Sequence, residues 1–215
     1  MPRPTPPIEK PSRRQEASEQ RRRAILDAAL DVFSEAGFAS ARLDDVATRA
    51  GVAKGTIYLF FKDKEDLFEQ MVLGAAAPVL GRVDDFVGRD IVFAELLAGL
   101  LEIFRVEILG TRRKEIIRLV IREGARFPRI AAFYHREVIA KGLALIRRAA
   151  TRARERGEVG SDALERFPHL VFAPLLMTII WDGVFSTIEP LDVEGLLAAH
   201  RDILVASQTK RSEPR

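Results

Sequence analysis

Apolar residues recur along most of this chain at the spacing of three and four residues that places side chains on one face of a helix. In the first such segment, over residues 17–36, one face carries Ile25, Ala29, Val32, Phe33 and Ala36. Gly37 follows where a left-handed residue would cap the helix. No stretch alternates apolar and polar residues over the length of a strand. The pattern predicts an all-α protein.

The next segment predicts two short helices joined by a tight turn. The first covers about residues 43–50 and has two aspartates, Asp44 and Asp45, in its first turn, where their charges favour a helix. Gly51 breaks the pattern, and a second short helix is predicted over 54–61. A longer helix then begins at Lys64 and reaches about Val87. Two short helices behind a longer supporting helix are typical of a helix-turn-helix.

Helical periodicity continues through the rest of the chain, interrupted by glycine and proline. It predicts further helices over residues 91–109, 112–126, 128–155, 162–186 and 192–207. Pro174 is expected to kink the fourth of these or to lie at an irregular turn.

Composition narrows the class of protein. The chain has 215 residues and no cysteine, which excludes disulfides, thiolate metal sites and cysteine nucleophiles. The first ten residues contain four prolines and no apolar stretch, so no signal peptide is expected there. The most apolar run, 170–181, is shorter than the about twenty residues that span a membrane. We expect a soluble, cytoplasmic protein.

Positive charge is concentrated at the start of the chain. The net charge is +3, yet residues 1–23 alone hold seven basic and three acidic side chains. Such an arm suits a polyanion, because Lys and Arg displace counterions from phosphates. A solvated, disordered leader would have the same composition, so the arm alone does not identify a partner.

The segment from residue 43 to residue 67 carries the strongest functional signal. Val46, Ala47 and Ala50 form one face of the first short helix, and Val52 and Ile57 anchor the turn and the second short helix. The side chains that point away from this anchor are Lys54, Thr56, Tyr58 and Leu59. They have the chemistry to contact phosphates, base edges and thymine methyl groups.

This segment resembles the TetR (tetracycline-repressor-like) family of transcriptional regulators. The resemblance rests on residues 47–58 and 61–67, and it covers about residues 20–68, roughly a quarter of the chain. Residues 123–128 are similar to a segment common in the regulatory domains of that family. The helical remainder is compatible with the family in length.

The resemblance implies a set of DNA contacts. The second short helix would enter the major groove and use Lys54, Thr56, Tyr58 and Leu59, while Lys64 would hold a phosphate at the start of the next helix. Ala41 stands where many members have threonine, and Arg42 follows it. Arg42 is therefore expected to contact a phosphate or a guanine, with Ser40 or the following acids capping the helix.

Some neighbouring residues have two interpretations. Arg49 is a solvated helix charge or a phosphate contact, and the sequence does not decide between them. Phe60 and Phe61 fit the core of the three-helix unit better than base stacking.

The second half of the chain lacks a catalytic signature. His135, His169 and His200 are widely spaced, and none has a metal-ligand partner four residues away. No glycine-rich phosphate loop is present. We expect no enzyme activity, no cofactor and no metal.

Dimerisation is one role expected for this half. The segment 162–186 is apolar nearly all round, so it must be covered on two sides. With the final helix it would form a two-fold four-helix interface, as the resemblance also implies. The candidate interface residues are Phe172, Leu176, Ile180, Val184, Leu197 and Leu204.

Ligand binding is the other expected role. Aromatic and charged residues on several helices could line an apolar cavity with a few polar groups, although each aromatic could equally belong to the core. The candidates are Phe93, Phe104, Arg118, Arg122, Phe127, Phe133, Tyr134, Met177 and Trp181. We hypothesise an apolar or amphipathic effector.

The sequence thus predicts four parts: a disordered basic arm (1–16), a helix-turn-helix DNA-binding domain (17–64), a helical regulatory and dimerisation domain (65–208) and a frayed tail (209–215). The favoured function is a homodimeric repressor that leaves its double-stranded DNA operator when a small molecule binds. The alternatives are an activator, a ligand-independent regulator, or an α-helical binding protein or enzyme whose N-terminal domain docks a partner.

Overall fold

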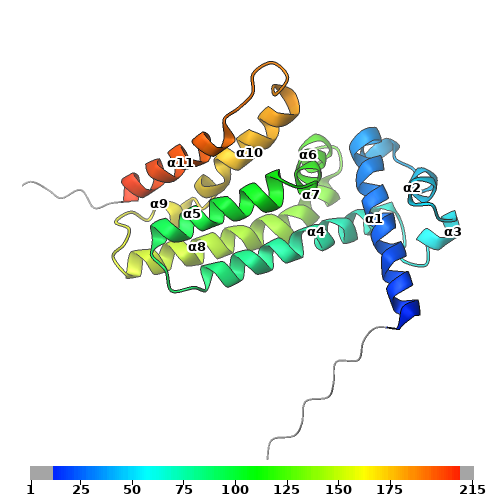
Figure 1. Ribbon diagram of the computed structural model, residues 1–215, viewed down its shortest axis with the longest axis horizontal. Helices are drawn as coiled ribbons and strands as arrows, with labels where there is room; N and C mark the ends of the chain where they lie inside the picture. The colour runs from blue at the N-terminus through cyan, green and yellow to red at the C-terminus, as the bar shows by residue number, and fades with distance from the viewer. Residues whose placement is uncertain (1–11, 209–215) are drawn as a thin grey trace, which may run out of the picture. The chain divides into compact units, whose positions relative to one another are not determined.

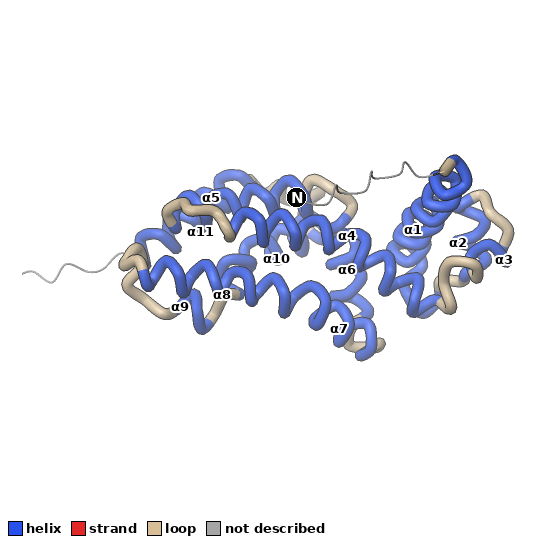
Figure 2. The backbone as a smooth tube through the Cα atoms, turned by 90° about the horizontal axis from the view of Figure 1, so that it is seen from below, coloured by secondary structure: helices blue, strands red, loops and turns tan. Residues whose placement is uncertain are grey.

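A computed structural model describes residues 12–208, and within that range every regular element is a helix (Figures 1 and 2). The chain divides into two compact units, Met1–Met71 and Val72–Arg215. The expected frayed tail, and the part of the basic arm before residue 12, lie outside the described residues.

The first unit contains α1 (Arg13–Ser40), α2 (Leu43–Ala50), α3 (Lys54–Ile57) and the start of α4 (Lys64–Val87). Three phenylalanines form its centre: the ring centroid of Phe33 lies 5.4 Å from that of Phe38 and 6.4 Å from that of Phe68. Ile25, Val46, Ile57 and Leu67 close around them and are fully buried. The apolar faces predicted for this segment therefore meet in one core.

The helical start of α1 corrects the expected arm. Ser12 accepts a hydrogen bond from the backbone of Gln15, and the Gln15 side chain accepts one from the backbone of Ser12. This capping box satisfies two amide groups that a helix end leaves open. Disorder is therefore wrong for residues 13–16, which form the first turn of α1.

Two glycine-dependent features position the elements that follow. Gly37 has φ 78° and ψ 158°, so the chain kinks there and is not capped by a left-handed helical residue as expected. The kink allows Phe38 to turn into the core, where it is 1% exposed. The helix predicted over 54–61 stops at Ile57, because the chain turns over Tyr58–Phe60 to bury Phe61.

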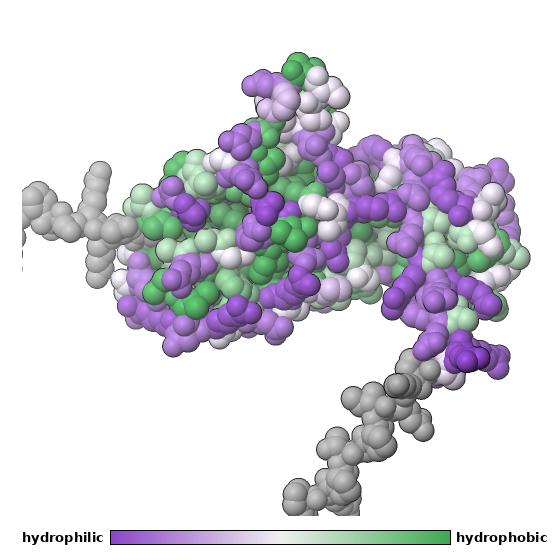
Figure 3. All heavy atoms as spheres, in the orientation of Figure 1, coloured by the Kyte–Doolittle hydropathy of each residue, from purple (hydrophilic) through white to green (hydrophobic). Residues whose placement is uncertain are grey.

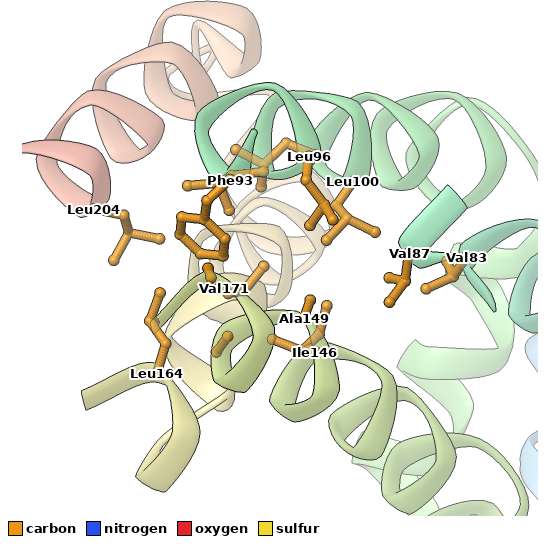
Figure 4. Close-up of a cluster of buried hydrophobic side chains, with 14 of the residues drawn as sticks. Val83, Val87, Phe93, Leu96, Leu100, Ile146, Ala149, Leu164, Val171 and Leu204 are labelled. Atoms are coloured by element: carbon orange, nitrogen blue, oxygen red, sulfur yellow. The ribbon is translucent and has the colours of Figure 1, made fainter. Parts of the chain in front are cut away.

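The second unit contains the remainder of α4 and the following elements: α5 (Phe93–Phe104), the π-helical turn η1 (Arg105–Leu109), α6 (Arg113–Glu123), α7 (Pro128–Tyr134), the π-helical turn η2 (His135–Ile139), α8 (Ala140–Glu155), α9 (Ala163–Arg166), α10 (His169–Val184) and α11 (Val193–Gln208). Five of these helices and α4 direct aliphatic and aromatic side chains into one shared interior (Figure 4).

The segment expected to be one helix over 162–186 is divided. Phe167, which precedes Pro168, has φ −126° and ψ 63°, and it separates α9 from α10. A residue before proline is pushed out of the helical region, so the break has a local steric cause. Pro174 lies inside α10 and is buried.

No helix within residues 12–208 has both the length and the apolar character needed to cross a membrane.

Candidate nucleic-acid interface

The turn between α2 and α3 depends on Gly51. This residue has φ 67° and ψ 31°, and its N–H donates to the carbonyls of Ala47 and Thr48. The next amide, that of Val52, also donates to the Ala47 carbonyl, at 3.0 Å. A Cβ at Gly51 would have no neighbouring atom within 4 Å, so the backbone conformation and not space requires glycine here. The tight turn expected from the sequence is present, with Gly51 in the left-handed conformation.

The exposed side of α3 and its turn carries the residues expected to meet DNA. Ile57 is fully buried and anchors α3 to the first unit, whereas 51% of Tyr58 and 81% of Leu59 is exposed. Lys54 is also exposed, and Thr56 is half-buried. The elements therefore present a mixed polar and apolar surface above a fixed apolar anchor.

Gly55 belongs to this surface and was not identified from the sequence. It lies inside α3, it is exposed, and a Cβ at this position would also have no neighbouring atom within 4 Å. The fold therefore gives no reason for glycine, which costs about 0.5–1 kcal/mol relative to alanine inside a helix. The signal available was a glycine placed between Lys54 and Thr56, within a predicted helix.

Lys54 is held by an acid from the neighbouring helix. Its Nζ lies 2.8 Å and 3.0 Å from the two carboxylate oxygens of Asp44 in α2. This contact raises the pKa of Lys54, and the positive charge of nearby Arg42 opposes the shift. Arg42 and Tyr58 both lie close enough to Lys54 to affect its pKa electrostatically.

Arg49 ties α2 to α1. Its guanidinium donates to both carboxylate oxygens of Glu35, at 2.6 and 2.8 Å. This hydrogen bond lowers the pKa of Glu35 and raises that of Arg49. Of the two interpretations left open by the sequence, neither describes this intramolecular pair.

Lys64 contacts backbone carbonyls of its own chain. Its ammonium donates to the carbonyls of Phe38, Ala39 and Ala41, at 2.8, 3.1 and 3.1 Å, and lies over the Phe38 ring. An ammonium has three donors, and all three are used here. In the described structure, Lys64 therefore satisfies carbonyls at the end of α1, and the expected phosphate contact stays a prediction.

Arg42 and Lys62 are the cations left available beside α3. Arg42 occupies the N-cap of α2 without a capping hydrogen bond from its side chain, and Ser40 does not cap this helix either, contrary to expectation. Within residues 12–208, neither the Arg42 nor the Lys62 side chain has an ion-pair partner, and both are exposed. Lys62 was missed because it lies in the loop between predicted helices.

The two phenylalanines after α3 differ in burial. Phe61 is 1% exposed and belongs to the core, and the guanidinium of Arg22 lies 5.8 Å from its ring centroid. Phe60 is half-buried and packs on Phe61, with ring centroids 6.2 Å apart.

In the second unit, the aromatic residues expected to line a cavity serve several packing sites. Phe93 and Phe133 are buried, whereas 44% of Met177 is exposed. Phe104 meets Phe172 edge-on at 4.6 Å. Trp181 packs on Phe185 and donates its Nε1 hydrogen to the Glu189 carbonyl at 2.7 Å. These side chains thus lie at separate packing sites in the described structure.

The remaining ligand candidates lie on α6, α7 and the segment between them. Arg122 is exposed, and its Nε is 3.3 Å from a carboxylate oxygen of Glu123, which is buried. Phe127 is half-buried. Tyr134 is half-buried as a residue, and burial of its phenol raises its pKa to about 12.

Arg118 joins α6 to α10. Its guanidinium donates to Glu115 on its own helix, to Asp182, and to the carbonyl of Ile179. Lys114 also donates to Asp182, at 2.9 Å, and this contact is the main cause of a lowered Asp182 pKa. Arg118 therefore serves helix packing in the described structure.

One cleft in the second unit lies between α5 and α11 and has a volume of about 230 Å³. Leu101 and Leu197 contribute apolar surface, and Arg105 pairs with both Glu102 and Glu194. None of the residues selected from the sequence as ligand contacts lines it.

The candidate interface residues divide into two groups. Leu176, Ile180 and Val184 are exposed on one side of α10 by 46%, 39% and 59%, and Figure 3 shows hydrophobic surface on the second unit. Phe172 is half-buried against Phe104. Leu197 and Leu204 are only 5% and 6% exposed because they point into the core (Figure 4, where Leu204 is labelled), so their assignment to an interface is wrong.

Sequence profiles now identify the family. A profile described as "Bacterial regulatory proteins, tetR family" matches residues 25–71, and one described as "Tetracyclin repressor-like, C-terminal domain" matches residues 94–199. The chain belongs to the TetR family. The first match covers the helix-turn-helix and the second covers most of the second unit.

Relatives of this TetR-family chain are named transcriptional regulators. AcrR of Shigella flexneri is 50% identical over 58 residues, which are 27% of this chain and 26% of that protein. UidR of Escherichia coli K12 is 27% identical over 196 residues, which are 86% of this chain and 94% of that protein. The chain thus aligns with about a quarter of AcrR and with nearly all of UidR. The family is one of regulators, which confirms the expectation of a regulator over an enzyme.

Solved structures share the fold. The FadR regulator of Bacillus subtilis, determined in complex with stearoyl-CoA, has a TM-score of 0.73 and 22% identity, over 86% of this chain and 98% of that one. SmeT, the repressor of a Stenotrophomonas maltophilia multidrug efflux pump, has a TM-score of 0.67 and 22% identity, over 89% and 91% of the two chains. The all-α fold expected from the sequence is confirmed.

Proposed function

We propose that this TetR-family chain is a homodimeric transcriptional repressor that leaves its DNA operator when a small apolar or amphipathic molecule binds to the second unit. The observation that carries the proposal is the exposed surface of α3 and of the turn that follows it, fixed in place by the buried Ile57. A solvent-exposed Leu59 beside Tyr58 and Thr56 has no function in the fold of the first unit, but it suits a groove edge.

Each exposed group has a chemistry that DNA can use. The guanidinium fork of Arg42 matches a phosphate or the O6 and N7 atoms of guanine. Thr56 and Tyr58 offer hydroxyl groups to base edges, and Leu59 offers an apolar contact to a thymine methyl group. Lys62 and Lys54 supply charge for phosphates, whereas Lys64 is not proposed as a contact.

The effector class follows from the relatives. A related regulator of Bacillus subtilis is named for fatty acid metabolism, and the FadR structure holds stearoyl-CoA. The cleft between α5 and α11, about 230 Å³, is lined by alanine and leucine side chains together with charged ones, a mixture that suits an amphipath. Sites for small molecules usually enclose about 300–1,000 Å³, so a long ligand requires the helices to separate. Separation of packed helices would give the ligand a preference for one state of the protein.

Dimerisation would use the apolar side of α10. Leu176, Ile180 and Val184 recur at helical spacing, and a two-fold axis would bring this side against its copy. A dimer would also supply two copies of α3 for successive major grooves, about 34–36 Å apart. The place of action would be the cytoplasm, where the DNA of a bacterial regulator lies.

Binding to DNA from the vicinity of its own gene tests the proposal. Fluorescence anisotropy with the flanking intergenic duplex and a scrambled duplex of equal length should give a preference for the former of about 10³-fold or more. Both affinities should fall steeply with salt. Equal affinity for the two duplexes would overturn the proposal. A reporter gene behind the bound segment then distinguishes repression from activation.

Release is tested separately by a thermal-shift screen of fatty acids, acyl-CoAs and small apolar drugs. Compounds that raise the melting temperature should also lower operator affinity, by about 5- to 150-fold for a typical coupling. Stabilising compounds that leave operator affinity unchanged would contradict ligand control.

A further inference from the structure

An acidic side chain lies within the surface proposed to meet DNA. Asp44 is the second residue of α2, and 45% of its side chain is exposed. Both of its carboxylate oxygens lie within 3.0 Å of the Lys54 ammonium. Across residues 12–208, neither side chain has another ion-pair partner. A carboxylate at this place repels phosphates and also neutralises the cation at the start of α3.

Asp44 adds little to the stability of the fold beyond what its neighbour Asp45 already contributes. Both Asp44 and Asp45 lie in the first turn of α2, where a negative charge favours the helix dipole. The link from Asp44 to α3 is an ion pair between two exposed side chains, a type of contact that stabilises proteins only slightly. The stability of the fold therefore does not determine which residue stands at position 44, and a role in binding can.

We propose that Asp44 is a specificity-determining residue, which competes with DNA phosphates for Lys54 and so weakens sequence-independent binding more than operator binding. The inference rests on the proposed DNA-binding function. A complex with random DNA is held by phosphate contacts alone, so each cation withheld lowers its affinity. In the complex with random DNA, the Lys54 ammonium keeps its ion pair with the Asp44 carboxylate.

The operator complex has a second source of affinity. Base contacts from Thr56 and Tyr58 fix α3 in the groove and hold a phosphate or base acceptor beside Lys54. Because the exposed pair with Asp44 is weak, Lys54 then exchanges the carboxylate for the DNA acceptor. Asp44 thus withholds Lys54 from random DNA and releases it at the operator.

The Asp44→Asn variant tests this exchange, with Asp45→Asn as its matched control. Both remove one negative charge from the first turn of α2, but only Asp44 contacts Lys54. Asp44→Asn should bind random duplex about 2- to 5-fold more tightly, as expected for an exposed pair. Its salt dependence should steepen by about 0.9 in the slope of log K against log[salt], for one added phosphate contact. Operator affinity should change less, so the operator-to-random ratio should fall.

Lys54→Gln completes a double-mutant cycle with Asp44→Asn. In the Lys54→Gln background, Asp44→Asn should no longer increase the affinity for random DNA, because Lys54 makes the added phosphate contact. Equal gains from Asp44→Asn and Asp45→Asn would show an effect of net charge and overturn the proposal. A gain that survives Lys54→Gln, or no gain at all, would also overturn it. Circular dichroism confirms that each variant is folded.

The failure of this inference differs from the failure of the proposed function. If the unmodified protein does not distinguish operator from random DNA, the repressor function fails, whatever Asp44→Asn does. If it does distinguish them but Asp44→Asn and Asp45→Asn bind random duplex alike, only the role of Asp44 fails.

Discussion

Gly51 and Gly55 lie four residues apart, and the backbone conformation explains the glycine at only the first of these positions. Gly51 has a φ of 67°, which a side chain would strain although the surrounding space is empty. Gly55 has no such backbone conformation, and its surroundings are equally empty. The first is thus required by the fold. The second is best explained by the close approach of a partner to α3.

Alanine at the two positions should separate these reasons. Gly51→Ala should lower the free energy of unfolding by about 1–2 kcal/mol, the cost of a left-handed conformation. Gly55→Ala should raise it by about 0.5–1 kcal/mol and still weaken operator binding, because its methyl group would meet the DNA. Chemical denaturation and anisotropy measure the two effects. A Gly55→Ala variant that binds the operator normally would contradict close approach at this residue.

Tyr134 allows a test by pH. Burial raises its pKa from 10.0 to about 12, so the neutral phenol favours the folded state. This contribution is complete below about pH 10 and is lost as the pH rises through about 12. The chain has two tyrosines, so Tyr58→Phe leaves Tyr134 as the only reporter of phenol ionisation at about 295 nm. Ionisation near pH 10 while the protein remains folded would contradict the burial.

At the scale of elements, periodicity was enough to predict α2 and α4, whose bounds agree with the expected ones. Periodicity did not predict helix boundaries at which the local geometry of one residue opposes the pattern of its neighbours. Pro168 divides an apolar segment whose hydrophobicity indicates one helix, and Ser12 with Gln15 starts α1 inside a segment whose charge indicates disorder. These outcomes depend on local sterics and capping, which a hydrophobic pattern does not contain.

The contacts of Lys64 also could not be predicted from the sequence. The family resemblance implies a phosphate contact, whereas the actual geometry depends on the Gly37 kink that brings three carbonyls to its ammonium. Such a convergence of backbone groups is not visible in a sequence. The exposed residues of α3 and of the turn after it were predictable because they follow from a short amphipathic pattern after Gly51.

Lys64→Met should therefore act on stability. Loss of charge-assisted hydrogen bonds to backbone carbonyls should cost roughly 1.5–3 kcal/mol of unfolding free energy. The salt dependence of DNA binding by the folded variant should be unchanged. Lys62→Met is the control: it should leave stability nearly unchanged and reduce the slope of log K against log[salt] by about 0.9 if Lys62 contacts a phosphate. A reduced slope in Lys64→Met instead would restore its phosphate role.

At the scale of the whole molecule, the apolar residues of α10 and α11 serve two purposes that the sequence did not separate. Leu176, Ile180 and Val184 are exposed, whereas Leu197 and Leu204 complete the core of the second unit. All five are aliphatic residues at helical spacing. Only the packing of α11 against its neighbours decides which side is internal, and that packing is a property of the tertiary structure.

Substitutions on the two sides should therefore have different effects. Ile180→Asp should yield a folded monomer in analytical ultracentrifugation with weakened operator binding, because a charge would be buried in the proposed dimer. Leu197→Ala should remain a dimer and lose about 2–5 kcal/mol of unfolding free energy through the cavity it leaves. A dimeric Ile180→Asp protein would place the interface elsewhere.

The most direct test of the central claim compares operator and scrambled duplex binding by the unmodified protein, Thr56→Ala and Tyr58→Ala, in anisotropy titrations at one salt concentration. If the exposed surface of α3 reads the bases, each substitution should lower operator affinity by about 1–3 kcal/mol per lost base contact and leave scrambled affinity nearly constant. An operator preference that is unchanged in both variants would contradict the assignment of α3 as the element that recognises DNA.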